Sequence, residues 1–395
     1  MGLHDQYVRL SDVSELITKG TTPTTLGFNF TSQGIGFLRV QNIDQGQVFF
    51  ERDVLYIDEK THLALKRSQI KSGDVLVSIA GSIGRAAVVP KNAPELNCNQ
   101  ALAIVRVRNT VFQPYLRYWL ESSDAQSQIR GATVTGTISN LSLTQLGNLK
   151  ILLPPIAEQK RIAAILDKAE ELRSLRRKAL GELDAIAQSI FLEMFGDPST
   201  NLMKWEKGCL GDVATFIGGG TPKRECPEYF EGSICWATSK DMKSEFLDDT
   251  QEHITPEAIK KSATNLVPIN TILIVVKSKI LMHSLPIAIA RVPTCFGQDI
   301  KGIKVLKRCE VTFVATALRY GKRWLLERAR GINTEGLTLD HLKAFPLLIP
   351  PIELQQEFAR RVEAIERLKT THRESIAQLD ALFASLQHRA FRGEL

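Results

Sequence analysis

The sequence predicts an α+β fold in which two similar globular domains are separated by an antiparallel pair of long helices, with an internal pseudo-two-fold repeat. Three observations predict it. The 395-residue chain repeats itself once, each copy starts with β-branched segments broken by glycine, and each copy ends in a long amphipathic helical pattern. At roughly 100–200 residues per domain, this length fits two domains.

The strongest internal signal is a repeat that extends along the whole chain. The segment LSDVSELITKGT at 10–21 is similar to LGDVATFIGGGT at 210–221, and LLPPIAEQKR at 152–161 is similar to LIPPIELQQE at 348–357. Between these blocks, Gln100 matches Gln298. The blocks keep their order and a nearly constant displacement, which argues against chance similarity. Each copy is long enough for a domain of its own.

Each copy consists of a mixed first part and a helical second part. In the first copy, segments 70–89 and 96–107 have the pattern of strands and turns, and 114–129 has the pattern of a helix. The second copy repeats these patterns. The predicted division is a first domain at 1–153, a first long helix at 154–198, a second domain at 199–348 and a second long helix at 349–395.

The two long helices have recognisable ends and a periodic apolar face. A Pro-Pro pair opens each of them, at 154–155 and 350–351, and Gly196-Asp197-Pro198 ends the first. The apolar positions follow coiled-coil spacing and are Ile162, Ile165, Ala169, Leu172, Ala179, Leu183, Ile186, Ile190, Phe358, Ile365, Leu368, Leu379, Leu382 and Leu386. A single helix with one apolar face needs a partner, so we predict that the two helices pair in antiparallel orientation.

Polar residues interrupt this apolar face at Arg176 in the first helix and at Arg361, His372 and Ser375 in the second. Arg176 and His372 occupy equivalent positions on the two helices. They either fix the register of the pair or extend from its edge into solvent. We also expect the N-terminal region to pack near the end of the second helix, which would close the repeat.

Composition favours a nucleic-acid partner and a cytoplasmic location. The chain has 50 Lys and Arg residues against 43 Asp and Glu residues, a formal net charge of +7. Its six cysteines include no C-x-x-C pair, and zinc-type His/Cys spacing is absent, which is typical of reduced cytoplasmic thiols without a metal site. The first residues do not resemble a signal peptide, and the apolar runs are too short to span a membrane.

Two similar domains on a stiff spacer of fixed length suit a partner with two separated features. Duplex DNA is such a partner, because successive major-groove faces on one side of the duplex are roughly 34 Å apart. The two domains differ in sequence, so the two half-sites that they read should also differ. The residues alone therefore favour an asymmetric, bipartite DNA site.

The order of motifs resembles that of type I restriction–modification specificity subunits, over essentially the whole chain. The motifs are L-S-D-V-(x)3-I-(x)2-G-T near a domain start, L-P-P-I-(x)2-Q-(x)2-I at a helix start, and F-G-D-P at the end of the first helix. The resemblance implies that 1–153 and 199–348 are target-recognition domains for double-stranded DNA. It implies that the helices dock two modification (methyltransferase) subunits, which bind S-adenosylmethionine and methylate adenine, and that motor–nuclease restriction subunits can join. It implies no catalytic residue, metal or cofactor in this chain.

Candidate DNA contacts lie in polar or Gly/Thr-rich turns at matching places in the two copies. Lys and Arg would contact phosphates, and polar side chains would read base edges. In the first domain the candidates are Thr21, Thr24, Arg39, Gln41, Asn42, Ser82, Arg85, Asn99, Gln100, Thr133 and Thr135. In the second they are Thr221, Lys223, Arg224, Thr238, Ser239, Lys240, Lys277, Lys279, Gln298 and Asn333. The alternative for each is an ordinary solvated turn.

One of these turns differs between the two copies. The first copy has AGSIG at 80–84, and the second has KSKIL at 277–281, which lacks both glycines. This difference argues against a shared backbone role, although the two lysines still favour phosphate contact.

Polar residues on the helices are candidates for contacts with partner subunits, with a solvated helix face as the alternative. They are Gln159, Arg161, Lys168, Arg177, Gln355, Arg360 and Lys369.

Three alternative functions are open at this point. FIGGG at 216–220 matches the F-x-G-x-G loop of methyltransferases, but the first copy has LITKG there and a [DN]-P-P-[YF] motif is absent. A scaffold that binds only proteins would use the same helices, but its binding would not weaken steeply with salt, as DNA binding does. The same chain would also suit a methylation-only complex that has no restriction subunit.

Overall fold

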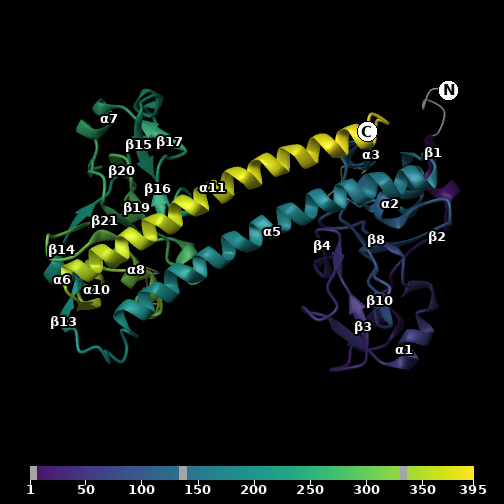
Figure 1. Cartoon of the computed structure of the whole chain (residues 1–395), viewed down its shortest axis with the longest axis horizontal. Helices are drawn as coiled ribbons and strands as arrows, with labels where there is room; N and C mark the ends of the chain where they lie inside the picture. The colour runs from purple at the N-terminus through teal and green to yellow at the C-terminus, as the bar shows by residue number, and fades with distance from the viewer. Residues whose placement is uncertain (1–6, 133–139, 330–335) are drawn as a thin grey trace. The chain divides into compact units, whose positions relative to one another are not determined.

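The structure consists of two compact units that share two long helices. A computed structural model describes residues 7–132, 140–329 and 336–395 (Figure 1). One unit comprises Met1–Lys178 and Arg373–Leu395, and the other comprises Ala179–His372. Helices α5 (Ile156–Phe195) and α11 (Ile352–Ala390) each contribute residues to both units. The predicted α+β fold with two long helices is confirmed, whereas the division at 153, 198 and 348 stays a prediction.

The first unit is built from short strands and four short helices that precede α5. Its strands are β1 (Tyr7–Arg9), β2 (Ser14–Lys19), β3 (Ile35–Leu38), β4 (Ile43–Asp44), β5 (Gln47–Val48), β6 (Leu55–Ile57), β7 (Gln69–Ile70), β8 (Val75–Ser78), β9 (Ala86–Val88), β10 (Leu96–Cys98), β11 (Leu102–Val107) and β12 (Lys150–Leu152). Its short helices are α1 (Glu59–Ala64), α2 (Gln113–Leu120), α3 (Ser123–Ala132) and α4 (Leu143–Gly147). The helix predicted at 114–129 is in fact two helices, because the hydroxyl of Ser122 accepts the Ala125 N–H and starts α3.

The second unit repeats this composition of elements. Its strands are β13 (Glu206–Cys209), β14 (Ala214–Gly218), β15 (Ile234–Ala237), β16 (Phe246–Leu247), β17 (Glu252–Ile254), β18 (Ile272–Val275), β19 (Ile287–Ala290), β20 (Thr294–Phe296), β21 (Ile300–Val305) and β22 (Pro346–Ile349). Its short helices are α6 (Leu210–Val213), α7 (Pro256–Lys260), α8 (Val311–Tyr320), α9 (Lys322–Ala329) and α10 (Leu339–Lys343).

The two units share a strand topology. The larger sheets have the orders β6-β3-β10-β7 and β2-β11-β8-β9 in the first unit, and β17-β15-β20 and β14-β21-β18-β19-β16 in the second. β3 runs parallel to β10, as β15 does to β20. β11 lies antiparallel between β2 and β8, as β21 does between β14 and β18. The repeat seen in the sequence is therefore a repeat of the fold.

Equivalent aromatic pairs attach the end of a long helix to the core of each unit. In the first unit, the rings of Tyr115 and Phe391 are 5.2 Å apart, and Val8 of β1 belongs to the same hydrophobic cluster. In the second, the rings of Phe313 and Phe195 are 4.8 Å apart. Such buried aromatic pairs contribute strongly to packing. The N-terminal strand and the end of α11 therefore share one core, as the sequence predicts.

A buried glutamine joins the start of α5 to the first unit. The Gln159 Oε1 atom accepts the Phe112 N–H at 2.8 Å, and its Nε2 donates to the carbonyl oxygens of Thr110 and Pro154 at 2.9 and 2.8 Å. The side chain is fully buried. Because both ends of the amide are used, the glutamine in the Pro-Pro-Ile motif has a structural role.

The equivalent glutamine does the same at the start of α11. The Gln355 Oε1 atom accepts the Glu310 N–H at 2.9 Å, and its Nε2 donates to the Pro350 carbonyl at 2.7 Å. The prediction that Gln159, Gln355 and Lys369 lie on exposed helix faces is wrong, since all three are buried.

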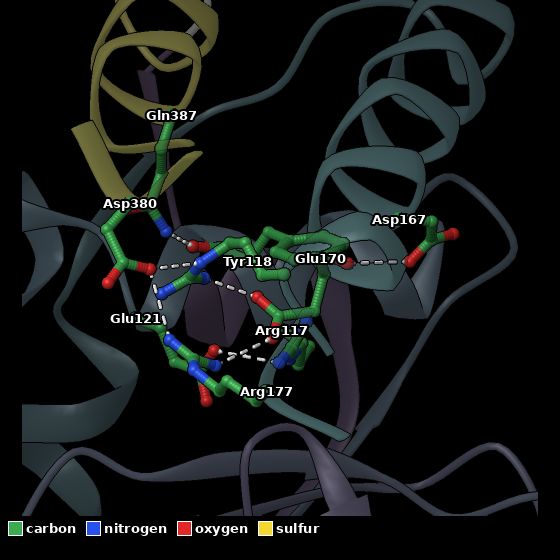
Figure 2. A network of polar contacts seen from close by, with 9 residues as sticks. Arg117, Tyr118, Glu121, Asp167, Glu170, Arg177, Asp380 and Gln387 are labelled. Carbon is green, nitrogen blue, oxygen red and sulfur yellow. Dashed lines mark hydrogen bonds and ion pairs between the residues drawn. The ribbon is translucent and has the colours of Figure 1, made fainter. Parts of the chain in front are cut away.

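An ion-paired group links α5 and α11 within the first unit (Figure 2). The Arg173 guanidinium contacts Asp380 of α11 at 2.6 Å and Glu170, one turn earlier on its own helix, at 2.5 Å. The Tyr118 hydroxyl of α2 donates to Asp167 of α5 at 2.7 Å. These contacts fix both helices against α2.

The second unit repeats the group with a lysine. Lys369 Nζ lies 2.7 Å from Asp184 of α5 and 2.7 Å from Glu366. Each of the three residues is displaced by 196 positions from its counterpart in the first unit. Arg176 is exposed and has no ion pair within the described residues. The register is therefore held by charged groups one turn before Arg176 and His372.

Within each unit the two long helices run antiparallel. In the second unit, Asp184 contacts Lys369, and Phe195 further along α5 contacts Phe358 nearer the start of α11. Several residues of the predicted apolar face are exposed, however. Their exposed fractions are 42% for Leu172, 45% for Ile186, 53% for Leu368 and 49% for Leu382. The helix pair is held largely by packing at the helix ends and by ion pairs, so these leucine and isoleucine side chains are available to other molecules.

Candidate nucleic-acid interface

The turns that carry the candidate residues of the first unit meet at one end of the sheets. The Thr21 N–H donates to the Cys98 carbonyl at 3.1 Å, which joins the turn after β2 to the turn after β10. The Asn99 N–H donates to the Leu38 carbonyl at 3.1 Å, which adds the turn after β3. Gly20 is needed here, because an added Cβ would lie 2.1 Å from the Asn99 carbonyl oxygen. The glycine of the repeated G-T motif therefore permits this close approach.

The turn between β8 and β9 joins the same surface. The Ile79 N–H donates to the Ala101 carbonyl at 2.9 Å. Gly81 and Gly84 shape this turn with positive φ angles of 72° and 89°. Arg85 follows this turn, and its guanidinium lies 3.6 Å from the Asp44 carboxylate. The four turns thus form one polar surface.

The candidates of the first unit differ in their availability. Thr24, Gln41, Ser82, Arg85 and Gln100 are exposed, and Thr21, Arg39 and Asn99 are partly buried. Thr133 and Thr135 lie outside the described residues.

Asn42 has a structural role in its turn and is not available for contact with DNA. It is fully buried, its Oδ1 accepts the Arg39 N–H at 2.8 Å, and its Nδ2 donates to the Arg52 carbonyl at 2.8 Å. We therefore leave Asn42 out of the proposed contact surface. Asp241 closes the equivalent turn of the second unit by accepting the Thr238 N–H at 2.8 Å.

The corresponding turns of the second unit also meet. The Gly220 N–H donates to the Phe296 carbonyl, and the Gly297 N–H donates to the Ala237 carbonyl, both at 2.9 Å. The Lys277 N–H donates to the Asp299 carbonyl at 3.3 Å. The turns after β14, β15 and β18 are therefore all attached to the turn after β20.

The glycine run in this unit is explained by backbone packing. A Cβ on Gly219 would lie 2.2 Å from the Gly297 carbonyl oxygen, and one on Gly220 would lie 2.4 Å from the Ala263 carbonyl carbon. FIGGG is thus the counterpart of the Gly20 contact. Backbone packing therefore explains the spacing of these glycines without a bound cofactor.

Most candidates of the second unit are exposed. They are Thr221, Lys223, Arg224, Lys240, Lys277, Lys279 and Gln298. Thr238 and Ser239 are partly buried, and Asn333 lies outside the described residues.

The turn after β18 differs from its counterpart, as the sequence indicates. In place of two glycines, a 3-10 helix spans Lys279–Met282, and the Ser278 hydroxyl accepts the Ile280 N–H at 3.3 Å. The two units therefore present different backbones at the same place.

The arginine side chains on the two surfaces have different neighbours. In the first unit, Arg39 is 3.3 Å from Asp53, and Arg85 is close to Asp44. In the second, Arg224 forms a two-bond pair with Glu252 at 2.8 and 2.9 Å. Its guanidinium carbon also lies 4.5 Å from the ring centre of Phe230 and 5.0 Å from that of Trp236.

In the described part of the second unit, four lysines carry a positive charge that no ion pair offsets. Lys223, Lys240, Lys277 and Lys279 are exposed and form no ion pair within the described residues. Exposed lysines around one polar surface would attract a polyanion.

No helix in the described part of the chain combines the length and apolar character that crossing a membrane requires.

Both copies of the repeat match one family of protein domains. The family is described as "Type I restriction modification DNA specificity domain", and the matches cover residues 5–184 and 203–381. The matched segments agree with the two copies of the sequence repeat.

Curated relatives and a solved structure are similar to the chain. The EcoR124I/EcoR124II specificity subunit of Escherichia coli is 28% identical over 272 residues, covering 66% of this chain and 64% of the relative, just under two thirds of its length. The MjaIX specificity subunit of Methanocaldococcus jannaschii is 22% identical over 409 residues, covering 98% of this chain and 92% of the relative. Both relatives are named as subunits of type I restriction enzymes.

One similar solved structure is the S subunit of a type I restriction–modification system from M. genitalium. It has a TM-score of 0.58 and 16% identity, covering 98% of this chain and 97% of that chain. This likeness supports a common fold.

Proposed function

Because the chain belongs to the family of type I restriction–modification DNA specificity domains, we propose that each unit reads one half of an asymmetric, bipartite DNA site. As a specificity subunit, the chain carries DNA recognition and not catalysis. Methylation of adenine, with S-adenosylmethionine as the donor, would belong to two modification subunits bound to this chain. Cleavage would belong to motor–nuclease subunits in a system that has them.

The observation that carries this proposal is that equivalent turns come together in both units but bear different side chains. Gln100 and Gln298 occupy matching exposed positions. Around them, Arg39 is replaced by Thr238, and the glycine turn with Arg85 is replaced by the lysine-bearing 3-10 helix. One backbone scaffold with two sets of polar side chains suits the reading of two different short sequences.

The experiment that tests this function is a methylation map. The chain would be co-expressed with its modification subunit, and methylated adenines would be located across genomic DNA. We expect one motif with two specified parts separated by unspecified base pairs. Scattered methylation, or a motif with one continuous part, would contradict the proposal.

The matching glutamines allow a sharper version of this test. A Gln side chain can bond an adenine edge through two atoms, and loss of a good base contact costs about 1–3 kcal/mol, or roughly 5- to 150-fold in discrimination. We expect Gln100→Ala to relax one half of the motif and Gln298→Ala to relax the other half. Sequencing of methylated DNA from libraries randomised in each half would measure this.

Each glutamine variant is the control for the other. A variant that changes both halves of the motif equally would contradict the assignment of one half-site to each unit. The double variant should combine the two single effects, because the residues lie in separate units.

The exposed apolar residues of the long helices support two equivalent docking sites for modification subunits. Leu172 of α5 corresponds to Leu368 of α11, and Ile186 of α5 corresponds to Leu382 of α11, each displaced by 196 positions. The first unit contains Leu172 and Leu382, and the second contains Ile186 and Leu368. Each unit thus has one such pair, and this recurrence in both copies supports one contact surface of the same kind in each unit.

We expect Leu172→Glu combined with Leu382→Glu to reduce the number of bound modification subunits from two to one. A charge at a buried contact is costly, whereas the pair in the second unit is unchanged. The mass of the reconstituted complex measures the number of subunits bound. Leu202→Glu is the matched control, because Leu202 is 81% exposed but lies outside the long helices. Retention of two subunits by the double variant would exclude this docking site.

A further inference from the structure

A cysteine, an aspartate and a histidine come together on the small sheet of the second unit. Cys235 of β15 and His253 of β17 are direct partners in the antiparallel register. Directly opposed residues place their side chains on the same face of a sheet. Asp249, in the segment between β16 and β17, reaches this pair from outside the sheet.

The three side chains have the separations of a metal-ligand group. Asp249 Oδ1 lies 2.7 Å from His253 Nε2 and 3.5 Å from Cys235 Sγ. All three ligand atoms lie within 4.8 Å of one another. Bond lengths of about 2.0–2.3 Å around a tetrahedral zinc ion place ligand atoms about 3.3–3.6 Å apart. Only small side-chain movements would therefore bring the three atoms to three corners of a tetrahedron.

Hydrogen bonding orients the carboxylate of this group, whereas burial keeps its thiol protonated until a cation binds. Cys235 is buried, and this burial raises the pKa of its thiol, so the free cysteine is protonated at neutral pH. Asp249 is oriented by the Thr250 N–H, which donates to its Oδ1 at 2.8 Å and lowers the pKa of the carboxyl group together with His253. The side chains of Asp249 and His253 are 74% and 32% exposed. A cation there would be open to water on one side.

The group is not a requirement of the fold. In the first unit, Gly36 of β3 pairs with Tyr56 of β6 and Leu96 of β10, as Cys235 pairs with His253 and Thr294. The equivalent strands therefore fold with glycine and tyrosine at the two positions. Among the described residues, this ligand set occurs in the second unit alone.

We propose that Cys235, Asp249 and His253 bind one divalent cation of the zinc class, with water in the fourth position. A thiolate, an imidazole and a carboxylate form a ligand set that zinc accepts. Binding releases the thiol proton to solvent, and it requires a neutral imidazole with its proton on Nδ1. The cation would fasten β15 and β17 to the preceding segment. His253 adjoins Glu252, the partner of Arg224, so the cation would also steady the candidate DNA surface.

Cobalt is the probe that tests this site, because a thiolate bound to Co²⁺ gives a charge-transfer absorption band. The full-length chain would be reduced, freed of metal by a chelator and titrated with Co²⁺. We expect a band that saturates at one cobalt per chain and disappears when Zn²⁺ is added. The variant Cys235→Ser should lack the band, and His253→Gln and Asp249→Asn should each weaken cobalt binding by about 100-fold or more.

The controls use a cysteine and a histidine of the same unit that lie outside the group. Cys226→Ser and His283→Gln should titrate like the unchanged chain. Far-ultraviolet circular dichroism would show that each variant is folded, and the largely exposed Asp249 offers a substitution with little effect on packing. Absence of the band in the unchanged chain would overturn the proposal. Retention of the band at full strength in both Asp249→Asn and His253→Gln would overturn it as well.

Discussion

Removal of four exposed lysines from the second unit should weaken binding of duplex DNA by roughly 10³-fold near physiological salt. The four residues, replaced together by alanine, are Lys223, Lys240, Lys277 and Lys279. Each phosphate contact releases condensed counterions, so the slope of log affinity against log salt should become shallower by about one for each lysine that contacts a phosphate. Fluorescence anisotropy with a labelled duplex at several salt concentrations would measure both quantities.

A matched variant separates local contact from net charge. Four other exposed lysines of the same unit lie near β13, α10 and the end of β21, away from the turn after β20, and they are Lys207, Lys304, Lys307 and Lys343. Replacing either set changes the formal charge of the chain from +7 to +3, because four positive charges are removed. We expect the control set to leave the salt slope nearly unchanged. Equal losses in both variants would mean that the second unit attracts DNA only through its net charge.

The fold was predictable from the sequence because both copies of the repeat have the same order of motifs. The Pro-Pro pairs and the Gly196-Asp197-Pro198 stop correctly predicted two long helices. The detailed apolar face was not predictable, because the helix pair uses Arg173 and Lys369 where spacing alone suggests exposed charges. Lys369 is paired with Glu366 of its own helix and with Asp184 of α5, and the contact with α5 is not revealed by a single segment. The signal that was present is the shared displacement of 196 positions for every member of the two charged groups.

The sequence placed the candidate residues in turns, and the binding of DNA by those turns stays a prediction. The structure shows that Gly20 and the FIGGG run lie where backbone segments approach closely, and it brings those turns together in each unit. The roles of individual polar residues were less accessible, because Asn42 is as polar as its exposed neighbours but is used inside the turn. The available signal was that Asp241, which closes the turn in the second unit, stands at the position equivalent to Asn42.

The cysteine–aspartate–histidine group shows why spacing rules missed the proposed ligand set. Cys235 is 14 positions from Asp249, and Asp249 is 4 from His253. Such separations match no common zinc motif, and the sequence therefore predicted no metal site. The residues meet only because β15 and β17 pair in one register, which is a property of the folded sheet.

Loss of the buried lysine should destabilise the second unit by about 3–5 kcal/mol, because Lys369→Ala removes the cation beside the buried Glu366 carboxylate, whereas its other partner, Asp184, is 65% exposed. Lys369 is 1% exposed and Glu366 is 5% exposed. Burial alone would lower the pKa of Lys369, but the hydrogen bonds with Asp184 and Glu366 outweigh it and raise that pKa. The stabilisation is therefore fully present below the pKa of unfolded lysine and is lost as the pH rises through the higher folded value.

Urea unfolding followed by tryptophan fluorescence would measure this loss, since Trp205, Trp236 and Trp324 belong to the second unit and Trp119 to the first. Lys168→Ala is the control, because Lys168 forms an exposed pair with Glu171 on the same type of helix and should change stability by less than about 0.5 kcal/mol. If the lysine matters through charge compensation, the double variant Lys369→Leu with Glu366→Leu should recover much of the stability, since apolar side chains can replace a buried ion pair. A double variant no more stable than Lys369→Ala would show instead that the packing of the lysine stem is what holds α11 to α5.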